Sequence, residues 1–87
     1  RDLALLLDKN VQFNQLRDLA FRSERKLLQS VDLFDVYEGK GVPEGKKSYA
    51  VSYILRDDEK TLNDKQIEKI MQKFVATYER ELDAKLR

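Results

Sequence analysis

Hydrogen-bonding side chains and one aromatic ring occur near the middle of the chain and could form a binding surface, among them Asp35, Tyr37 and Ser48. A carboxylate accepts hydrogen bonds, a phenol offers a flat ring for stacking, and a hydroxyl can donate or accept. Because alternate side chains of a strand share a face, Asp35 and Tyr37 are expected to point the same way. The spacing predicts a polar binding face in this part of the chain.

A β-hairpin is predicted to carry these residues. Segments 31–38 and 46–56 are rich in β-branched and aromatic residues with period-2 character, and the intervening residues 39–45 contain three glycines and a proline. Strict alternation places Leu33 with Asp35 and Tyr37 on one face, and Phe34 with Val36 on the other. The second face is large and apolar, which is typical of the side of a sheet that packs on a core.

Length and composition limit the kinds of function that the chain can have. The chain has 87 residues, of which 41% are hydrophobic and 38% charged, and its net charge is +1. A chain of this size forms one domain and buries roughly 60 to 65% of its unfolded surface. It has no cysteine and no histidine, which argues against disulfides, thiolate catalysis and an ordinary zinc site. The balanced charge gives no strong indication of a polyanion partner.

The extent of the chain and its hydropathy give two further expectations. The sequence begins at Arg1 without a methionine, so we expect a domain spanning residues 1–87 that is a fragment of a larger chain. No apolar run approaches the roughly 20 residues that span a bilayer, and a cytoplasmic location without a membrane partner is expected.

The remaining elements are predicted from periodicity and caps. Residues 3–7 form an apolar run of strand length, and a helix of about four turns is expected from Asn14 as N-cap through Leu28. Asn63 and Gln66 match a capping box that opens a second helix, which continues to Leu82. Residues 84–87 are long enough for a final strand.

The order strand, helix, strand, strand, helix, strand predicts an α+β fold. We expect a ferredoxin-like βαββαβ two-layer sandwich, in which two helices cover one face of a four-stranded antiparallel sheet. The side chains expected to face the helices are Leu3, Leu5, Leu7, Phe34, Val36, Tyr49, Val51, Tyr53 and Leu55. Those expected on the open face are Asp2, Ala4, Leu6, Asp35, Tyr37, Ser48, Ala50, Ser52, Lys85 and Arg87.

Five blocks in order along the whole chain carry a family resemblance: RDLALLLD, LFDVYEG, GKKSYAVSYIL, KTLNDKQIEKIM and AKLR. In this order and spacing the chain resembles the ferredoxin-fold anticodon-binding domain that closes the β chain of bacterial phenylalanyl-tRNA synthetase. The chain departs from the family pattern at Asp83, where a glycine is common. Asp is among the residues that best tolerate the left-handed conformation expected there.

The resemblance implies a function in tRNA recognition. It implies that Asp35, Tyr37 and Ser48 approach the first anticodon base, a guanine, in the anticodon stem-loop of tRNA(Phe). Lys46, Lys47, Lys85 and Arg87 are candidates for phosphate contacts, which position RNA without specifying its sequence. We expect no catalytic residue, metal or cofactor in this domain. The parent enzyme is expected to use ATP and magnesium elsewhere and to pair its β chain with an α chain in a heterotetramer.

Two other classes share this topology. An acylphosphatase-like hydrolase needs an anion-binding loop with a catalytic arginine after the first strand, and the segment DKNVQFN has neither glycine nor arginine. A non-catalytic module that binds a protein or a small ligand is the alternative, because an open sheet face can also bind these partners.

Overall fold

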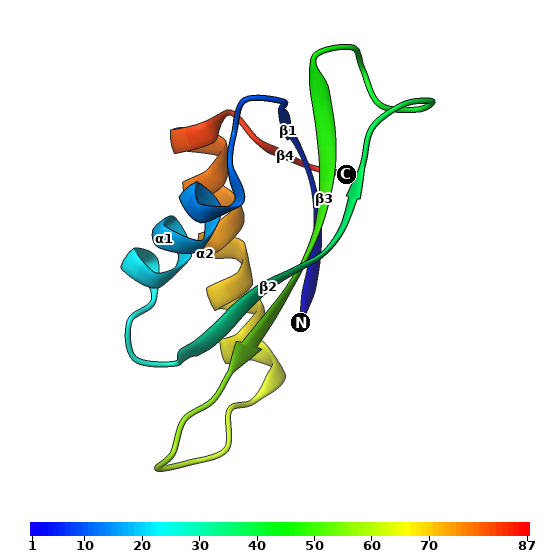
Figure 1. Ribbon diagram of the computed structural model, residues 1–87. Coiled ribbons are helices and arrows are strands. Elements are labelled where there is room, and N and C mark those ends of the chain that lie inside the picture. Colours follow the sequence, from blue (N-terminus) through cyan, green and yellow to red (C-terminus); the bar gives the residue numbers. More distant parts are fainter.

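The fold is the predicted two-layer sandwich. A computed structural model describes all 87 residues, and Figure 1 shows its six elements in chain order. They are β1 (Asp2–Asp8), α1 (Phe13–Ser23), β2 (Leu28–Tyr37), β3 (Lys46–Leu55), α2 (Asp64–Leu82) and β4 (Lys85–Leu86). The strand order is β2-β3-β1-β4, and every neighbouring pair is antiparallel. This topology confirms the α+β ferredoxin-like prediction.

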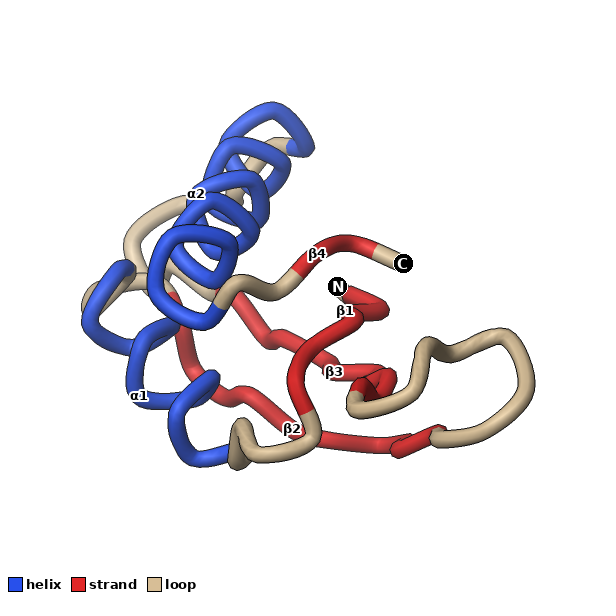
Figure 2. Tube along the Cα trace, turned by 90° about the horizontal axis from the view of Figure 1, so that it is seen from above, coloured by secondary structure: helices blue, strands red, loops and turns tan.

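Both helices lie on one side of the sheet, and the loop between β2 and β3 lies toward the other side (Figure 2). The core fills the space between the layers. Its largest fully buried side chains include Tyr53 and Phe74, whose rings stack with centroids 5.2 Å apart. The other face of the sheet has no helix over it, so its side chains are available to a ligand. Neither helix is long and apolar enough to cross a membrane.

The second helix begins and ends where local side-chain chemistry requires. The Asn63 side chain accepts a hydrogen bond from the Gln66 backbone at 2.8 Å, and the Gln66 side chain accepts one from the Asn63 backbone at 3.1 Å. This reciprocal pair satisfies two backbone donors that the first turn leaves free, and it confirms the predicted capping box. At the other end Asp83 has φ 53° and ψ 30°, the left-handed conformation expected at this position.

The first helix is shorter than predicted. It starts at Phe13 with Gln12 as N-cap, and it ends at Ser23 instead of continuing to Leu28. The Glu24 carboxylate accepts hydrogen bonds at 3.2 Å from the backbone N–H groups of Lys26 and Leu27, which turns the chain out of the helix. Leu28 is then the first residue of β2. The helical spacing of Leu27 and Leu28 was therefore misleading, because both side chains pack in the core from outside the helix.

A β-bulge in β2 overturns part of the predicted facing pattern. Leu33 pairs with Val51 and Asp35 with Ala50, so Phe34 is an extra residue and the alternation shifts by one. Leu33 consequently lies on the core side and not beside Asp35. Phe34 and Val36, both predicted to face the helices, are 59% and 49% exposed. Val36 shares its side with Tyr49, but this end of β2 runs beyond the helices (Figure 1).

Two buried tyrosines are joined by their hydroxyl groups. Tyr53 from β3 and Tyr78 from α2 lie 2.8 Å apart, oxygen to oxygen, and Tyr78 donates to the Leu16 carbonyl at 3.3 Å. Because a carbonyl can only accept, Tyr53 is the donor to Tyr78. The chain of hydrogen bonds links the sheet to both helices through the core.

Removing the two hydroxyls separately should have unequal effects. Tyr78→Phe leaves the Tyr53 hydroxyl without an acceptor, so we expect a loss of about 1 to 3 kcal/mol in the free energy of unfolding. Tyr53→Phe leaves Tyr78 bonded to Leu16 and should cost less, about 1 kcal/mol or below. Urea unfolding of both variants measures the difference, and equal losses would contradict this order.

Alkaline pH should destabilise the domain through the same pair. Burial raises the pKa of Tyr53 and raises the pKa of Tyr78 to about 12. A tyrosine of the unfolded chain loses its proton near pH 10 while the buried one keeps it, so stability is complete below pH 10 and falls above it. Each tyrosine contributes about 1.4 kcal/mol per pH unit in this window. Urea unfolding from pH 9 to 12 should therefore show a shallower decline for Tyr53→Phe than for the wild type.

Candidate nucleic-acid interface

Strand register brings the predicted site residues into one row across the open face. Tyr37 of β2 pairs with Ser48 of β3, Ser48 pairs with Leu6 of β1, and Leu6 pairs with Lys85 of β4. Asp35 lies in the adjacent row, opposite Ala50. The bulge is what keeps Asp35 and Tyr37 on this face while Val31 and Leu33 of the same strand pack toward the core. The structure thus brings together the three residues that the sequence selected.

Asp35 is free to accept hydrogen bonds from a ligand. Its side chain is exposed and takes part in none of the four ion pairs of the chain. Its direct partner across the sheet is Ala50, whose methyl group cannot donate a hydrogen bond to its oxygens. An ionised carboxylate in this position can accept two parallel N–H donors.

Tyr37 has its hydroxyl engaged and its ring partly accessible. The hydroxyl donates to the Lys40 carbonyl at 2.7 Å, which ties the ring to the start of the hairpin loop. The side chain keeps 39% exposure. The guanidinium of Arg87 lies over the ring, with its Cζ 5.4 Å from the ring centroid. A ring fixed in this way can stack with a planar group at little further loss of conformational freedom.

Ser48 lies on the expected face but is less accessible than its partners, with 6% exposure. Its neighbours across the sheet, Tyr37 and Leu6, are much larger and stand on either side of it. With so little exposed surface, the hydroxyl can interact only with a group that lies directly against this row, over a hydrogen-bond distance.

The four candidate phosphate contacts differ in the interactions that their charged groups already make. Lys46 pairs with Asp8 at 2.7 Å, and this hydrogen bond raises the pKa of the lysine. The Lys47 ammonium donates to the Val11 carbonyl and lies 4.6 Å from the centroid of the Tyr49 ring. Lys47 pairs with Leu7, which is fully buried, so it lies on the helix side of the sheet.

Lys85 and Arg87, by contrast, are exposed and form no ion pair. They stand at the β4 edge of the open face, next to Leu6 and Ala4 of β1. Of the four cations, these two have their charge most available to an anion approaching the open face.

Sequence reasoning missed two features of this surface. Phe34 was assigned to the core, whereas the bulge sets it with Asp35 against Ala50 and leaves it exposed. The contact between Arg87 and Tyr37 joins residues fifty positions apart and has no local signature. The misassignment of Phe34 could have been detected in the sequence. In a regular strand Val31, Leu33, Asp35 and Tyr37 share one face, so the two apolar residues could not lie in the core while the two polar ones are exposed.

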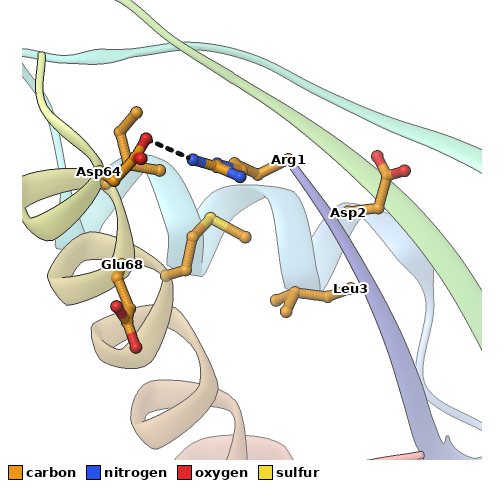
Figure 3. A pocket seen from close by; sticks show the side chains of 7 residues that line it. Arg1, Asp2, Leu3, Asp64 and Glu68 are labelled. Atoms are coloured by element: carbon orange, nitrogen blue, oxygen red, sulfur yellow. Dashed lines mark hydrogen bonds and ion pairs between the residues drawn. The ribbon is translucent and has the colours of Figure 1, made fainter.

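One hollow on the surface has a different character from the open face. Figure 3 shows one between the start of β1 and the start of α2, where Arg1 pairs with Asp64 at 3.1 Å. Asp2 and Glu68 also line it, so carboxylates outnumber cations and the local charge opposes a phosphate. No cluster of three or more potential metal ligands occurs in the chain.

Comparisons with known proteins give a consistent result. The model of the ferredoxin-fold anticodon binding domain matches residues 1–87. The chain is 62% identical to the β subunit of phenylalanine-tRNA ligase from Bacteroides thetaiotaomicron and 66% identical to that from Porphyromonas gingivalis. It is 42% identical to the β subunit from Clostridium acetobutylicum.

Each of these matches covers all 87 residues of the chain and 11% of the relative's length. The chain therefore spans about a tenth of the proteins it resembles. The coverage of the family model and the identities over the full chain agree with the ferredoxin-like topology. The chain belongs to the ferredoxin-fold anticodon-binding domain family.

Proposed function

We propose that this chain is the anticodon-recognition module of a phenylalanine-tRNA ligase β subunit and that its ligand is the anticodon stem-loop of tRNA(Phe). The observation that carries the proposal is the placement of Asp35, Tyr37 and Ser48 together on the uncovered face of the sheet. Each offers a different interaction, and all three can act on one planar base.

The chemistry of the three side chains suits a guanine at the first anticodon position. Bases in RNA loops can be splayed out, stacked on an aromatic ring and hydrogen-bonded along their Watson-Crick edge. The ring of Tyr37 supplies the stacking surface. The Asp35 carboxylate accepts from the adjacent N1 and N2 donors of guanine, a pair that no other base presents on that edge. Ser48 adds one hydrogen bond to the edge of the base.

The phosphates are contacted from the β4 edge. Lys85 has no competing ion pair and stands on the exposed edge strand, so it is the first candidate. Lys46 and Lys47 can contribute only if they exchange their present partners, Asp8 and the Val11 carbonyl, for phosphate oxygens. With a net charge of +1, the domain contributes recognition rather than strong general attraction to RNA.

The rest of the ligase performs the chemistry. The site is a binding surface, and none of its residues forms a catalytic arrangement of nucleophile and base. Attachment of phenylalanine to tRNA, with its ATP and magnesium, is assigned to other parts of the enzyme. So are the contacts of the β subunit with the α subunit, and the proposed location of the whole enzyme is the cytoplasm.

The stacking role of Tyr37 gives the first test. Tyr37→Ala in the intact ligase should weaken binding of the anticodon stem-loop by about 1 to 3 kcal/mol, roughly 5- to 150-fold, because base stacking is lost. Tyr37→Phe keeps the ring and gives up only the bond to Lys40, so it should bind within a few-fold of the wild type. Fluorescence anisotropy with a labelled stem-loop measures both dissociation constants.

Ile54→Ala is the matched control for this test. Ile54 is an exposed apolar residue on the same face of β3, six residues from Ser48 and so about 20 Å along the strand. Its substitution should leave the affinity unchanged. If Tyr37→Ala bound RNA as well as Ile54→Ala does, the site would lie elsewhere.

Discrimination by Asp35 gives a second test. The wild-type ligase should prefer a stem-loop with guanine over one with adenine at the first anticodon position. Asp35→Asn replaces an acceptor of two N–H groups by a mixed donor and acceptor, so guanine binding should weaken by about 1.5 to 3 kcal/mol while adenine binding changes little. Dissociation constants for the two stem-loops give the ratio.

An unchanged guanine preference in Asp35→Asn would contradict this role. If the wild type itself showed no dependence on the base and no affinity for the stem-loop, the open face would instead serve a protein partner, the other use that its exposed apolar side chains permit.

A further inference from the structure

The open face carries two more carboxylates in the row that follows Asp35 and Ala50. Asp32 of β2 and Asp2 of β1 both pair with Ser52 of β3, so these three residues cross the sheet side by side. Ser52 is two residues beyond Ala50, which places this row about 7 Å farther along β3. We call Asp2, Ser52 and Asp32 the carboxylate row.

Neither carboxylate of this row is neutralised within the chain. Asp2 and Asp32 are exposed and take part in none of the four ion pairs. Arg1 precedes Asp2, but its guanidinium is bound to Asp64 of α2 at 3.1 Å, and Figure 3 shows the Asp2 carboxylate pointing away from that pair. The row therefore presents two negative charges to any group that lies over it.

The fold gains no stability from this arrangement. Neighbouring strands are about 4.8 Å apart, so the Cα atoms of Asp2 and Asp32 lie roughly 10 Å apart on either side of Ser52. Like charges on one face of a sheet repel each other, and no cation lies between them. The two carboxylates are thus better explained by an effect on a ligand than by an effect on folding.

The exposed cations of the open face lie toward its other end. Lys85 pairs with Leu6, which is four residues beyond Asp2 and so about 13 Å from it along β1. The guanidinium of Arg87 lies over the ring of Tyr37, which is in the same row as Lys85. The charge on the open face therefore changes from positive beside Tyr37 to negative at the carboxylate row.

We propose that Asp2 and Asp32 are specificity-determining residues that act by repulsion and keep RNA phosphates off the end of the open face that carries the carboxylate row. The inference rests on the proposed function. An aromatic ring stacks bases of every kind, so Tyr37 alone does not control where the rest of a strand lies. A strand that continues from Tyr37 over the carboxylate row meets two charges within about one Debye length, roughly 8 to 10 Å. A strand that continues toward Lys85 meets a cation instead.

Repulsion of this kind weakens incorrect complexes more than the correct one. A stem-loop whose first anticodon base contacts Tyr37 and Asp35 has its phosphates at the Lys85 end, so the carboxylate row affects its affinity little. An unstructured strand can lie on the face in many ways, and those that cross the row are disfavoured. Discrimination is obtained by penalising the alternative as well as by favouring the cognate ligand.

The test uses the double variant Asp2→Asn/Asp32→Asn in the intact ligase. Unlabelled oligouridylate, long enough to lie along the whole face, competes against a labelled anticodon stem-loop, so that only binding at this surface is measured. The variant should be competed about fivefold more strongly than the wild type, because two repulsive charges are removed. Its dissociation constant for the stem-loop itself should stay within about twofold of the wild type. Thermal unfolding checks that the fold is intact.

Asp18→Asn/Glu79→Gln is the matched control. It changes the net charge by the same amount, and both residues are exposed, unpaired and located on the helices. Competition by oligouridylate should be unchanged in this variant, because its charges are removed from the helix layer and not from the open face.

Three results would overturn the proposal. Wild-type competition in the Asp2, Asp32 variant would show that the carboxylate row does not act on RNA. An equal gain in the control would assign the effect to net charge instead of to position. A stem-loop that bound as much more tightly as the oligouridylate would place the row beside the cognate RNA and remove its role in specificity. Failure of the proposed function is reported separately, by wild-type binding of the stem-loop to Tyr37→Ala.

Discussion

The register of β2 against β3 is the constraint on which the binding face depends. Val31, Leu33, Asp35 and Tyr37 have the same parity, yet the first two pack in or against the core and the last two are exposed. A regular strand would turn all four the same way. The extra residue at Phe34 resolves the conflict by shifting the alternation between Leu33 and Asp35. One bulge therefore serves the core at one end of the strand and the site at the other.

The rest of the fold fixes this strand pair in place. The helices cover only one face, and the hydroxyls of Tyr53 and Tyr78 join the sheet to α2 and, through the Leu16 carbonyl, to α1. These bonds hold the sheet against the helices from the core side. On the open face, Asp35 takes part in none of the ion pairs, and the Tyr37 hydroxyl is bonded to Lys40 of the hairpin loop.

Sequence reasoning succeeded where the information is local. The capping box at Asn63 and Gln66 and the left-handed Asp83 depend on a few adjacent residues, and both were predicted correctly. The sequence-based predictions failed where the structure depends on which groups pair with each other. The end of α1 depends on Glu24 capturing backbone donors, and the exposure of Phe34 depends on which residues of β3 lie opposite it. The prediction that Asp35 and Tyr37 share a face is correct because the bulge precedes both residues and leaves the alternation between them regular.

The weak net charge agrees with a site that works at short range. A strongly basic surface attracts any RNA, whereas the open face combines the ring of Tyr37 with three carboxylates, those of Asp2, Asp32 and Asp35. Stacking and hydrogen bonds act only when a base is in contact, so they select among loops that have already arrived. The β subunits that this chain resembles are about nine times its length, and in a protein of that size other surfaces can supply the attraction. The contribution that this geometry favours is discrimination by contact, and in the proposed site it rests on Tyr37 and Asp35.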